Sequence, residues 1–280
     1  MESLVATEWL AGELSKSDLR IVDASWFLPE DGRDARAEFE AGHIPGAVFL
    51  DLGELADTSS GLPNMLPSAE KFASRAQAIG LGDGNRVVVY DNSPYRSAAR
   101  AWWMLNLFGA HEVAVLDGGL AKWKAEGRAM ESGKPVVRHR HFTVWKDTSH
   151  IRSIDQMKDN LKTRAEQVVD ARSGPRFRGE EPESRPGVRA GHIPGSFNLP
   201  HGELFNADGT YKNVAELKAA FTAIGIDPER PVVTTCGSGM TAAVLSFALH
   251  LVGAPKTALY DGSWAEWGGA ADTPVVTGAA

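Results

Sequence analysis

Residues 41–47 read AGHIPGA and residues 190–196 read AGHIPGS, so the two stretches differ only in their last residue. VDAS at 22–25 precedes the first stretch, and VDAR at 169–172 precedes the second. Further along the chain, LDGGLAKW in the first half matches YDGSWAEW in the second. Because the matches occur in the same order in both halves, the sequence predicts one domain that is present twice.

Each half also contains the same series of expected elements after its Gly-His-Ile-Pro-Gly motif. A run rich in Val or Thr is followed by a helical pattern and then by a short strand that ends in Asp-Gly. The expected strand, helix and strand are 86–90, 97–108 and 113–117 in the first half, and 231–235, 241–252 and 258–261 in the second.

Strands that alternate with helices predict an α/β fold, in which each domain is a mostly parallel sheet flanked by helices. We expect an N-terminal domain at 1–135, a linker at 136–149 and a C-terminal domain at 150–280, because Gly, Pro and basic residues interrupt the periodicity around 131–148.

Composition excludes several classes of protein. The chain has 280 residues, a net charge of −7 and no block of basic residues, so we expect no binding to nucleic acid. The N-terminus lacks the pattern of a signal peptide, and the longest nearly apolar run, 242–254, is too short to span a membrane. These features predict a cytoplasmic protein whose thiols stay reduced.

The only cysteine, Cys236, lies in TTCGSGMTA at 234–242, between an expected strand and an expected helix. One cysteine excludes an internal disulfide and a zinc site of several cysteines. Gly237 and Gly239 allow successive N–H groups to turn inward beside a helix N-terminus, an arrangement that favours an anionic sulfur. The alternative is that Cys236 is a small buried apolar residue.

The two halves differ at this loop. With the Asp-Gly segments in register, Cys236 falls opposite Asn92, which indicates an active domain paired with a catalytically degenerate one. A phosphatase loop of the type Cys-x5-Arg is excluded because Ala242 stands where the arginine is needed.

The repeated histidines, His43 and His192, have two interpretations. They are either general bases or structural groups that satisfy nearby backbone atoms at a Pro-Gly turn. Since both halves carry the histidine and only one carries the cysteine, the structural interpretation is favoured.

Paired Gly-His-Ile-Pro-Gly motifs and a C-terminal loop Cys-Gly-Ser-Gly-Met-Thr resemble the two-domain rhodanese family, and within it the 3-mercaptopyruvate sulfurtransferases. Thiosulfate sulfurtransferases usually carry Arg and Lys after the cysteine, where this chain has Gly237 and Ser238. The resemblance implies that Cys236 takes sulfur from 3-mercaptopyruvate as a persulfide, releases pyruvate, and passes the sulfur to cyanide or to a thiol acceptor such as a thioredoxin. It also implies that no metal or organic cofactor is needed.

The resemblance also implies the residues of the site. In RFRGEEPESRPG at 176–187, Arg176 and Arg185 match the arginines that hold the substrate, whereas Arg178 is expected to be structural or exposed. The alternative is that both arginines are solvated charges among the neighbouring acids. Cys236 and Ser238 are the expected catalytic residues, and the expected substrate-binding loop residues are Gly237, Gly239, Met240 and Thr241.

In some relatives the loop serine works with a histidine and an aspartate of the first domain. Here Asn64 and Gly53 stand at those positions, so we expect no such triad, although Asn64 can still donate a hydrogen bond. Two other functions remain open, a thiosulfate sulfurtransferase and a sulfur-carrier or redox module without turnover.

Overall fold

The computed structural model describes residues 1–279, which divide into two compact units. The first unit contains residues 1–57, 66–147 and 205–211, and the second contains 58–65, 148–204 and the chain from 212 onward. Two short segments, 58–65 and 205–211, thus belong to the opposite unit from their neighbours in sequence. The repeat pattern does not contain this exchange, and the contiguous boundaries 1–135, 136–149 and 150–280 stay a prediction.

The first unit is a five-stranded sheet in the order β1-β5-β4-β2-β3, with every strand pair parallel. Its strands are β1 (Leu4–Val5), β2 (Leu19–Asp23), β3 (Ala47–Phe49), β4 (Arg86–Tyr90) and β5 (Glu112–Leu116). Its helices are α1 (Thr7–Glu13), α2 (Ala35–Ala41), α3 (Leu52–Leu55), α4 (Ala69–Ala78), α5 (Ala98–Leu107) and α6 (Gly119–Ala125), with a 3-10 turn η1 at Pro29–Asp31.

The second unit repeats this topology as β6-β10-β9-β7-β8, again with parallel pairs. Its strands are β6 (Ile151–Arg152), β7 (Gln167–Asp170), β8 (Ser196–Asn198), β9 (Val232–Thr235) and β10 (Thr257–Tyr260). Its helices are α7 (Ile154–Thr163), α8 (Gly174–Arg178), α9 (Val214–Ala223), α10 (Ala242–Leu251) and α11 (Ser263–Trp267), with 3-10 turns η2 (Thr148–His150) and η3 (His201–Leu204).

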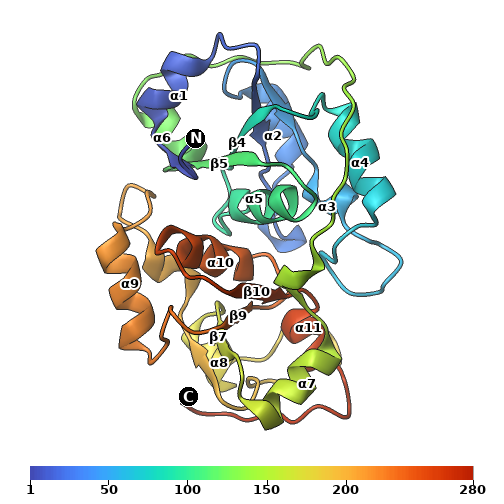
Figure 1. Ribbon diagram of the computed structural model, residues 1–280, viewed down its shortest axis with the longest axis vertical. Helices are drawn as coiled ribbons and strands as arrows, with labels where there is room; N and C mark the ends of the chain where they lie inside the picture. The colour runs from blue at the N-terminus through green and yellow to red at the C-terminus, as the bar shows by residue number, and fades with distance from the viewer. Residues whose placement is uncertain (280) are drawn as a thin grey trace. The chain divides into compact units, whose positions relative to one another are not determined.

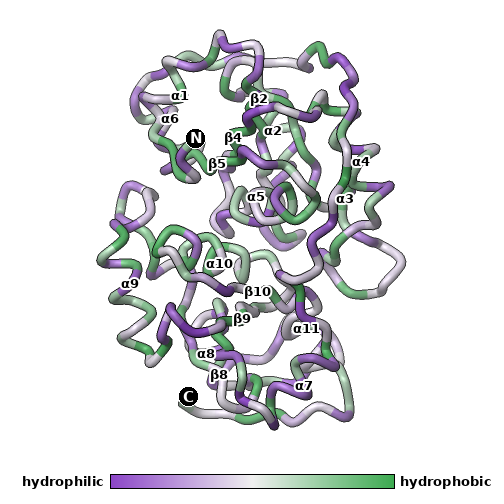
Figure 2. Tube along the Cα trace, in the orientation of Figure 1, coloured by the Kyte–Doolittle hydropathy of each residue, from purple (hydrophilic) through white to green (hydrophobic). Residues whose placement is uncertain are grey.

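The expected α/β fold with parallel sheets is confirmed in both units. The two long expected helices are α5 and α10, each shorter by one residue at either end than the sequence indicated. Both pack on the central strands of their own sheet, α5 on β4 and β5 and α10 on β9 and β10 (Figure 1). Figure 2 shows the hydrophobic colour along α10 and the nearby strands. Helices cover these strands, which explains their continuous apolar runs.

The histidine of each Gly-His-Ile-Pro-Gly motif is buried and held by its own unit. His43 and His192 are 1% and 2% exposed. His43 Nδ1 lies 2.7 Å from the carbonyl oxygen of Phe39, and His192 Nδ1 lies 2.8 Å from that of Phe177. Each imidazole stacks on the ring of the same phenylalanine. Burial also lowers the pKa of His192, so this ring stays neutral and serves as a structural hydrogen-bond donor.

Strand register brings the Val-Asp-Ala segment of the second unit to the cysteine loop. Asp170, the last residue of β7, pairs with Thr235, the last residue of β9. The residues that follow, Ala171 and Cys236, therefore leave neighbouring strands at the same carboxyl edge, where ligands bind in sheets of this kind.

Candidate active site

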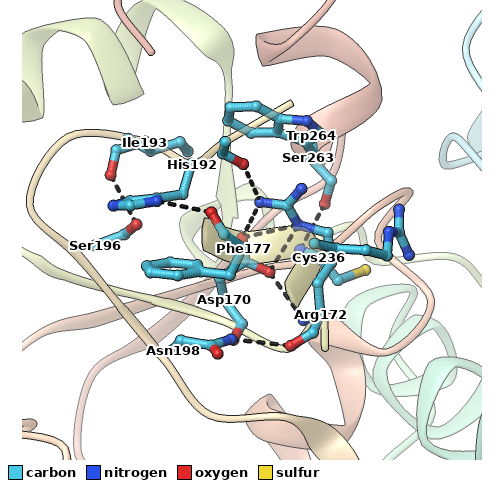
Figure 3. A network of polar contacts seen from close by, with 12 residues as sticks. Asp170, Arg172, Phe177, His192, Ile193, Ser196, Asn198, Cys236, Ser263 and Trp264 are labelled. Carbon is cyan, nitrogen blue, oxygen red and sulfur yellow. Dashed lines mark hydrogen bonds and ion pairs between the residues drawn. The ribbon is translucent and has the colours of Figure 1, made fainter. Parts of the chain in front are cut away.

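The cysteine loop joins β9 to α10 and is fixed by the first turn of α11. The backbone N–H groups of Trp264 and Ala265 donate to the carbonyl oxygens of Cys236 and Gly237, both at 2.9 Å. The N–H of Cys236 donates to Ser263 Oγ at 3.3 Å (Figure 3). Cys236 itself is 1% exposed. The backbone that carries the thiol is thus held from the side of α11, and the N–H of the cysteine is used for this attachment.

The two glycines of the loop serve different purposes. Gly239 has a φ of +79°, a left-handed conformation that favours glycine. Gly237 has no such requirement, but a Cβ there would lie 3.3 Å from Nη2 of Arg176. Glycine at 237 therefore lets a guanidinium approach the backbone directly after the cysteine.

A buried ion pair lies beside the loop. Arg172 donates from Nη2 to Asp170 Oδ2 at 2.7 Å (Figure 3). It also donates from Nη2 to the carbonyl oxygen of Gly191 and from Nη1 to Glu183 Oε1, both at 2.8 Å. Its guanidinium carbon lies 4.5 Å from the ring centroid of Trp264. Burial alone would lower the pKa of Arg172, yet the ion pairs with Asp170 and Glu183 outweigh it and raise that pKa. Arg172 is a permanent cation.

Glu183 joins this pair to Arg176. Its carboxylate is 3% exposed and accepts from Arg176 through both Nε, at 3.3 Å, and Nη2. Arg176 comes from α8 and its side chain is 32% exposed, so part of the guanidinium remains open to solvent. The structure therefore brings Arg176 to the cysteine loop, the place that the resemblance implies for it, and holds it there through a buried acid.

The other arginines of this segment differ from Arg176. Arg178 pairs with the exposed Glu180 at 2.7 Å, in agreement with a structural or exposed role. Arg185 lies on a turn and is half-buried, and its guanidinium makes no hydrogen bond or ion pair within residues 1–279. A half-buried cation without a protein partner is available to an anionic ligand.

Ser238 has a partner that the sequence left in doubt. Asn64, which belongs to the second unit through the segment 58–65, donates from Nδ2 to Ser238 Oγ at 2.9 Å. Asn64 has a φ of +57°, a backbone conformation that asparagine tolerates better than most residues. The sequence allowed for a hydrogen bond from Asn64, and the structure shows that the position which carries histidine in some relatives does contact the serine here. Gly53 lies in α3 of the first unit.

Met240 and Thr241 lead from the loop into α10. The Met240 side chain is 3% exposed and packs in the interior, while Thr241 is the half-buried residue before the first helical turn. Their place at the helix N-terminus shapes the loop and leaves Met240 little surface to offer a substrate.

Sequence reasoning missed Arg172, Asp170, Glu183 and Ser263. The repeat contained a signal for the first of these, because VDAR has an arginine where the other half has Ser25. Ser263 has the same signal, since Gly119 stands opposite. The sequence contains no such signal for Glu183, because an acid among several in EEPE at 180–183 is expected to be a solvated surface charge.

The first unit keeps the outline of this site without its chemistry. A cavity of about 450 Å³ lies at the same edge of its sheet and is lined in part by Asp23, Ser25 and Asn92. Asp23 is 2% exposed and has no counterpart of Arg172, and burial raises its pKa to about 6. The cysteine and the arginine are thus both absent from the same half.

No helix within residues 1–279 is long and apolar enough to cross a membrane.

Comparison with known proteins agrees with the repeat. The model of the rhodanese-like domain matches residues 6–126 and again 153–270. The human protein named 3-mercaptopyruvate sulfurtransferase is 42% identical over 271 residues, which cover 95% of this chain and 91% of that protein. A Cricetulus griseus protein named thiosulfate sulfurtransferase is 39% identical over 95% of this chain and 91% of its own length.

Among solved structures, that of SseA, a 3-mercaptopyruvate sulfotransferase from Escherichia coli with the rhodanese fold, superposes with a TM-score of 0.87 at 36% identity. The match covers 94% of this chain and 99% of that one. Two matched domains, relatives of nearly equal length and the shared fold agree, and the chain belongs to the rhodanese family.

Proposed function

We propose that the protein is a sulfurtransferase that moves sulfur from 3-mercaptopyruvate through a persulfide on Cys236 to a thiol or cyanide. The observation that carries the proposal is the approach of Arg176 to Gly237, directly beside the only cysteine. A cation at this point suits a donor that presents a carboxylate next to its reacting sulfur.

In the first half-reaction the Cys236 thiolate attacks the sulfur of 3-mercaptopyruvate. An S–S bond forms, and the C–S bond breaks with its electron pair moving onto the carbon. The resulting enolate takes up the proton of the donor thiol and becomes pyruvate, which leaves an anionic persulfide on the enzyme. Stabilising this outer sulfur and the enolate requires fixed donors and cations rather than a metal or an organic cofactor.

In the second half-reaction an acceptor attacks the outer sulfur and the S–S bond breaks, which restores the Cys236 thiolate. Cyanide would become thiocyanate, and a thiol acceptor such as a thioredoxin would become a persulfide. A chain with a single reactive thiol suits a reducing compartment, and we place the protein in the cytoplasm on that ground.

In this proposal Cys236 is the nucleophile and Ser238 a hydrogen-bond donor to the leaving enolate. Arg176 and Arg185 bind the carboxylate and the ketone. Three loop residues shape the donor pocket, Gly237, Gly239 and Thr241, and buried Met240 supports the loop from the interior.

The leading alternative donor is thiosulfate, since one relative with 39% identity carries that name. Thiosulfate is a dianion and would gain from cations directly after the cysteine, where this chain has Gly237 and Ser238. A sulfur-carrier module is the alternative without turnover.

Initial rates with each donor and with cyanide or a thioredoxin as acceptor test the proposal. We expect kcat/KM for 3-mercaptopyruvate to exceed that for thiosulfate, with pyruvate formed over many cycles. A clear preference for thiosulfate would overturn the choice of donor. Pyruvate limited to one equivalent per chain, with excess acceptor present, would indicate a carrier.

A further inference from the structure

The acidic residues of the segment 180–183 fall into two groups in the structure. The side chain of Glu180 is 56% exposed and pairs with Arg178 at the surface. The side chain of Glu183 is 3% exposed and lies between two arginines, Arg172 and Arg176. Burying a carboxylate is costly unless cations and donors surround it, so the two arginines are what stabilise Glu183 in this place.

Glu183 is anchored on its inner side. Arg172, which donates to Glu183 Oε1 at 2.8 Å, has a side chain that is only 1% exposed. Arg172 is fixed in turn by Asp170 and by the carbonyl oxygen of Gly191. The carboxylate therefore has little freedom to move, and the guanidinium that it holds on its outer side is aimed by the fold rather than by solvent.

On the outer side, Glu183 accepts from both Nε and Nη2 of Arg176. The same Nη2 faces Gly237, where an added Cβ would lie 3.3 Å away. Arg176 thus spans from the buried acid to the cysteine loop, and its direction at the loop depends on Glu183.

The charges of this cluster balance. Arg172 and Arg176 contribute two positive charges, and Asp170 and Glu183 contribute two negative ones. Half-buried Arg176 therefore offers N–H groups in a fixed direction, while the negative charge of Glu183 offsets much of its positive charge. Such a group suits a sulfur donor with one negative charge near the reacting sulfur. It stabilises a dianionic sulfur donor less well, because a dianion needs cations whose charge is not already offset.

We propose that Glu183 is a positioning residue that holds Arg176 at the cysteine loop and, through its charge, biases the site toward monoanionic sulfur donors over dianionic ones. This inference rests on the proposed function. It predicts that donor preference changes when the charge of Glu183 is removed and that overall donor binding weakens when its reach is shortened.

Two substitutions separate charge from position. Glu183→Gln keeps the length of the side chain and removes its charge, so the ratio of kcat/KM for thiosulfate to that for 3-mercaptopyruvate should rise about tenfold. Glu183→Asp keeps the charge and shortens the reach, so KM should rise for both donors while the ratio stays near that of the wild type. Glu180→Gln makes the same change of charge at the exposed acid of this segment and should leave both quantities unchanged.

The ratio is measured within each preparation, so a fraction of unfolded enzyme cancels from it. Where thiosulfate turnover is too slow to follow, the binding of thiosulfate is measured as its inhibition constant in the reaction with 3-mercaptopyruvate. This constant is then compared with the KM for 3-mercaptopyruvate. The proposal is overturned if Glu183→Gln keeps the wild-type ratio, or if Glu183→Asp shifts the ratio equally. Loss of the proposed function would be seen separately, as a wild-type enzyme that does not turn over 3-mercaptopyruvate.

Discussion

Asn64 donates a hydrogen bond from its side-chain amide to the hydroxyl oxygen of Ser238, at 2.9 Å. Because the amide donates to this oxygen, the hydroxyl proton of Ser238 is not used in the contact with Asn64. In the proposed mechanism Ser238 is therefore a hydrogen-bond donor to the leaving enolate and not a base. The side-chain amide does not ionise near neutral pH. Asn64 can therefore orient the serine hydroxyl but cannot act as a general acid or base.

If the pair acts as a unit, its two members should not act additively. Asn64→Ala and Ser238→Ala should each lower kcat by about fivefold to tenfold, the effect expected of one hydrogen bond in a shielded site. The double substitution should cost little more than Ser238→Ala alone, because the amide then has no hydroxyl to orient. Steady-state kinetics on the three variants checks this, and fully multiplicative losses would show that Asn64 does not act through Ser238.

Replacing Asn64 by histidine should add an ionisable group at the serine. We expect Asn64→His to show a new dependence of kcat on pH between about pH 6 and 7, the range in which imidazole titrates. Asn64→Gln serves as the control, since it is polar and does not titrate. A pH profile of Asn64→His that matches that of Asn64→Gln would argue against proton transfer at this position.

The arginines of α8 and the following turn should differ in their effect on donor binding. Arg176→Lys and Arg185→Lys should each raise KM for 3-mercaptopyruvate about tenfold, because an ammonium group cannot hold a carboxylate through two parallel hydrogen bonds. Arg178→Lys is the matched control, since Arg178 belongs to the same helix and pairs with an exposed acid. An equal KM for the Arg178 and Arg176 variants would show that Arg176 does not bind the sulfur donor.

Corresponding aspartates of the two units should respond in opposite ways to the same substitution. Burial raises the pKa of Asp23 to about 6, so the folded state holds its proton more tightly than the unfolded state does. This group therefore costs stability as pH rises from about 4 to 6, and the full cost, about 2–3 kcal/mol, is present above that range. Asp23→Asn should raise the free energy of unfolding at pH 7.5. The difference between the free energies of unfolding at pH 7.5 and pH 5 should be smaller in this variant than in the wild type.

Asp170 is the counterpart of Asp23 in the second unit and pairs with buried Arg172. Asp170→Asn should destabilise the protein by about 3 kcal/mol, because it removes one acid from a buried cation. Denaturant unfolding of both variants at pH 7.5 and pH 5 tests the contrast. Changes of the same sign at pH 7.5 would contradict this account of the two halves.

Sequence patterns located the elements of the fold well and the contacts of the site only in part. The strand 86–90 and the helices 97–108 and 241–252 were predicted to within about one residue, because apolar periodicity and Gly or Pro at their ends are local signals. The exchange of 58–65 and 205–211 between the units depends on contacts far apart in sequence, and no local pattern encodes it.

The site shows the same division. The position of Cys236 between a strand and a helix follows from its neighbours in sequence, and Arg176 followed from a resemblance. The burial of Glu183 did not, because its environment is created by Arg172 from a different element. Asn64 was recognised as a substitution, but its contact with Ser238 required the structure.

The central claim is that Cys236 carries the transferred sulfur, and intact mass measurement tests it most directly. After incubation with 3-mercaptopyruvate and no acceptor, the chain should gain about 32 Da, the mass of one sulfur, with one equivalent of pyruvate released. Cyanide should then remove the added mass, and Cys236→Ser should show neither the gain nor the pyruvate. A Cys236→Ser variant that gains the sulfur or keeps full pyruvate release would contradict the account.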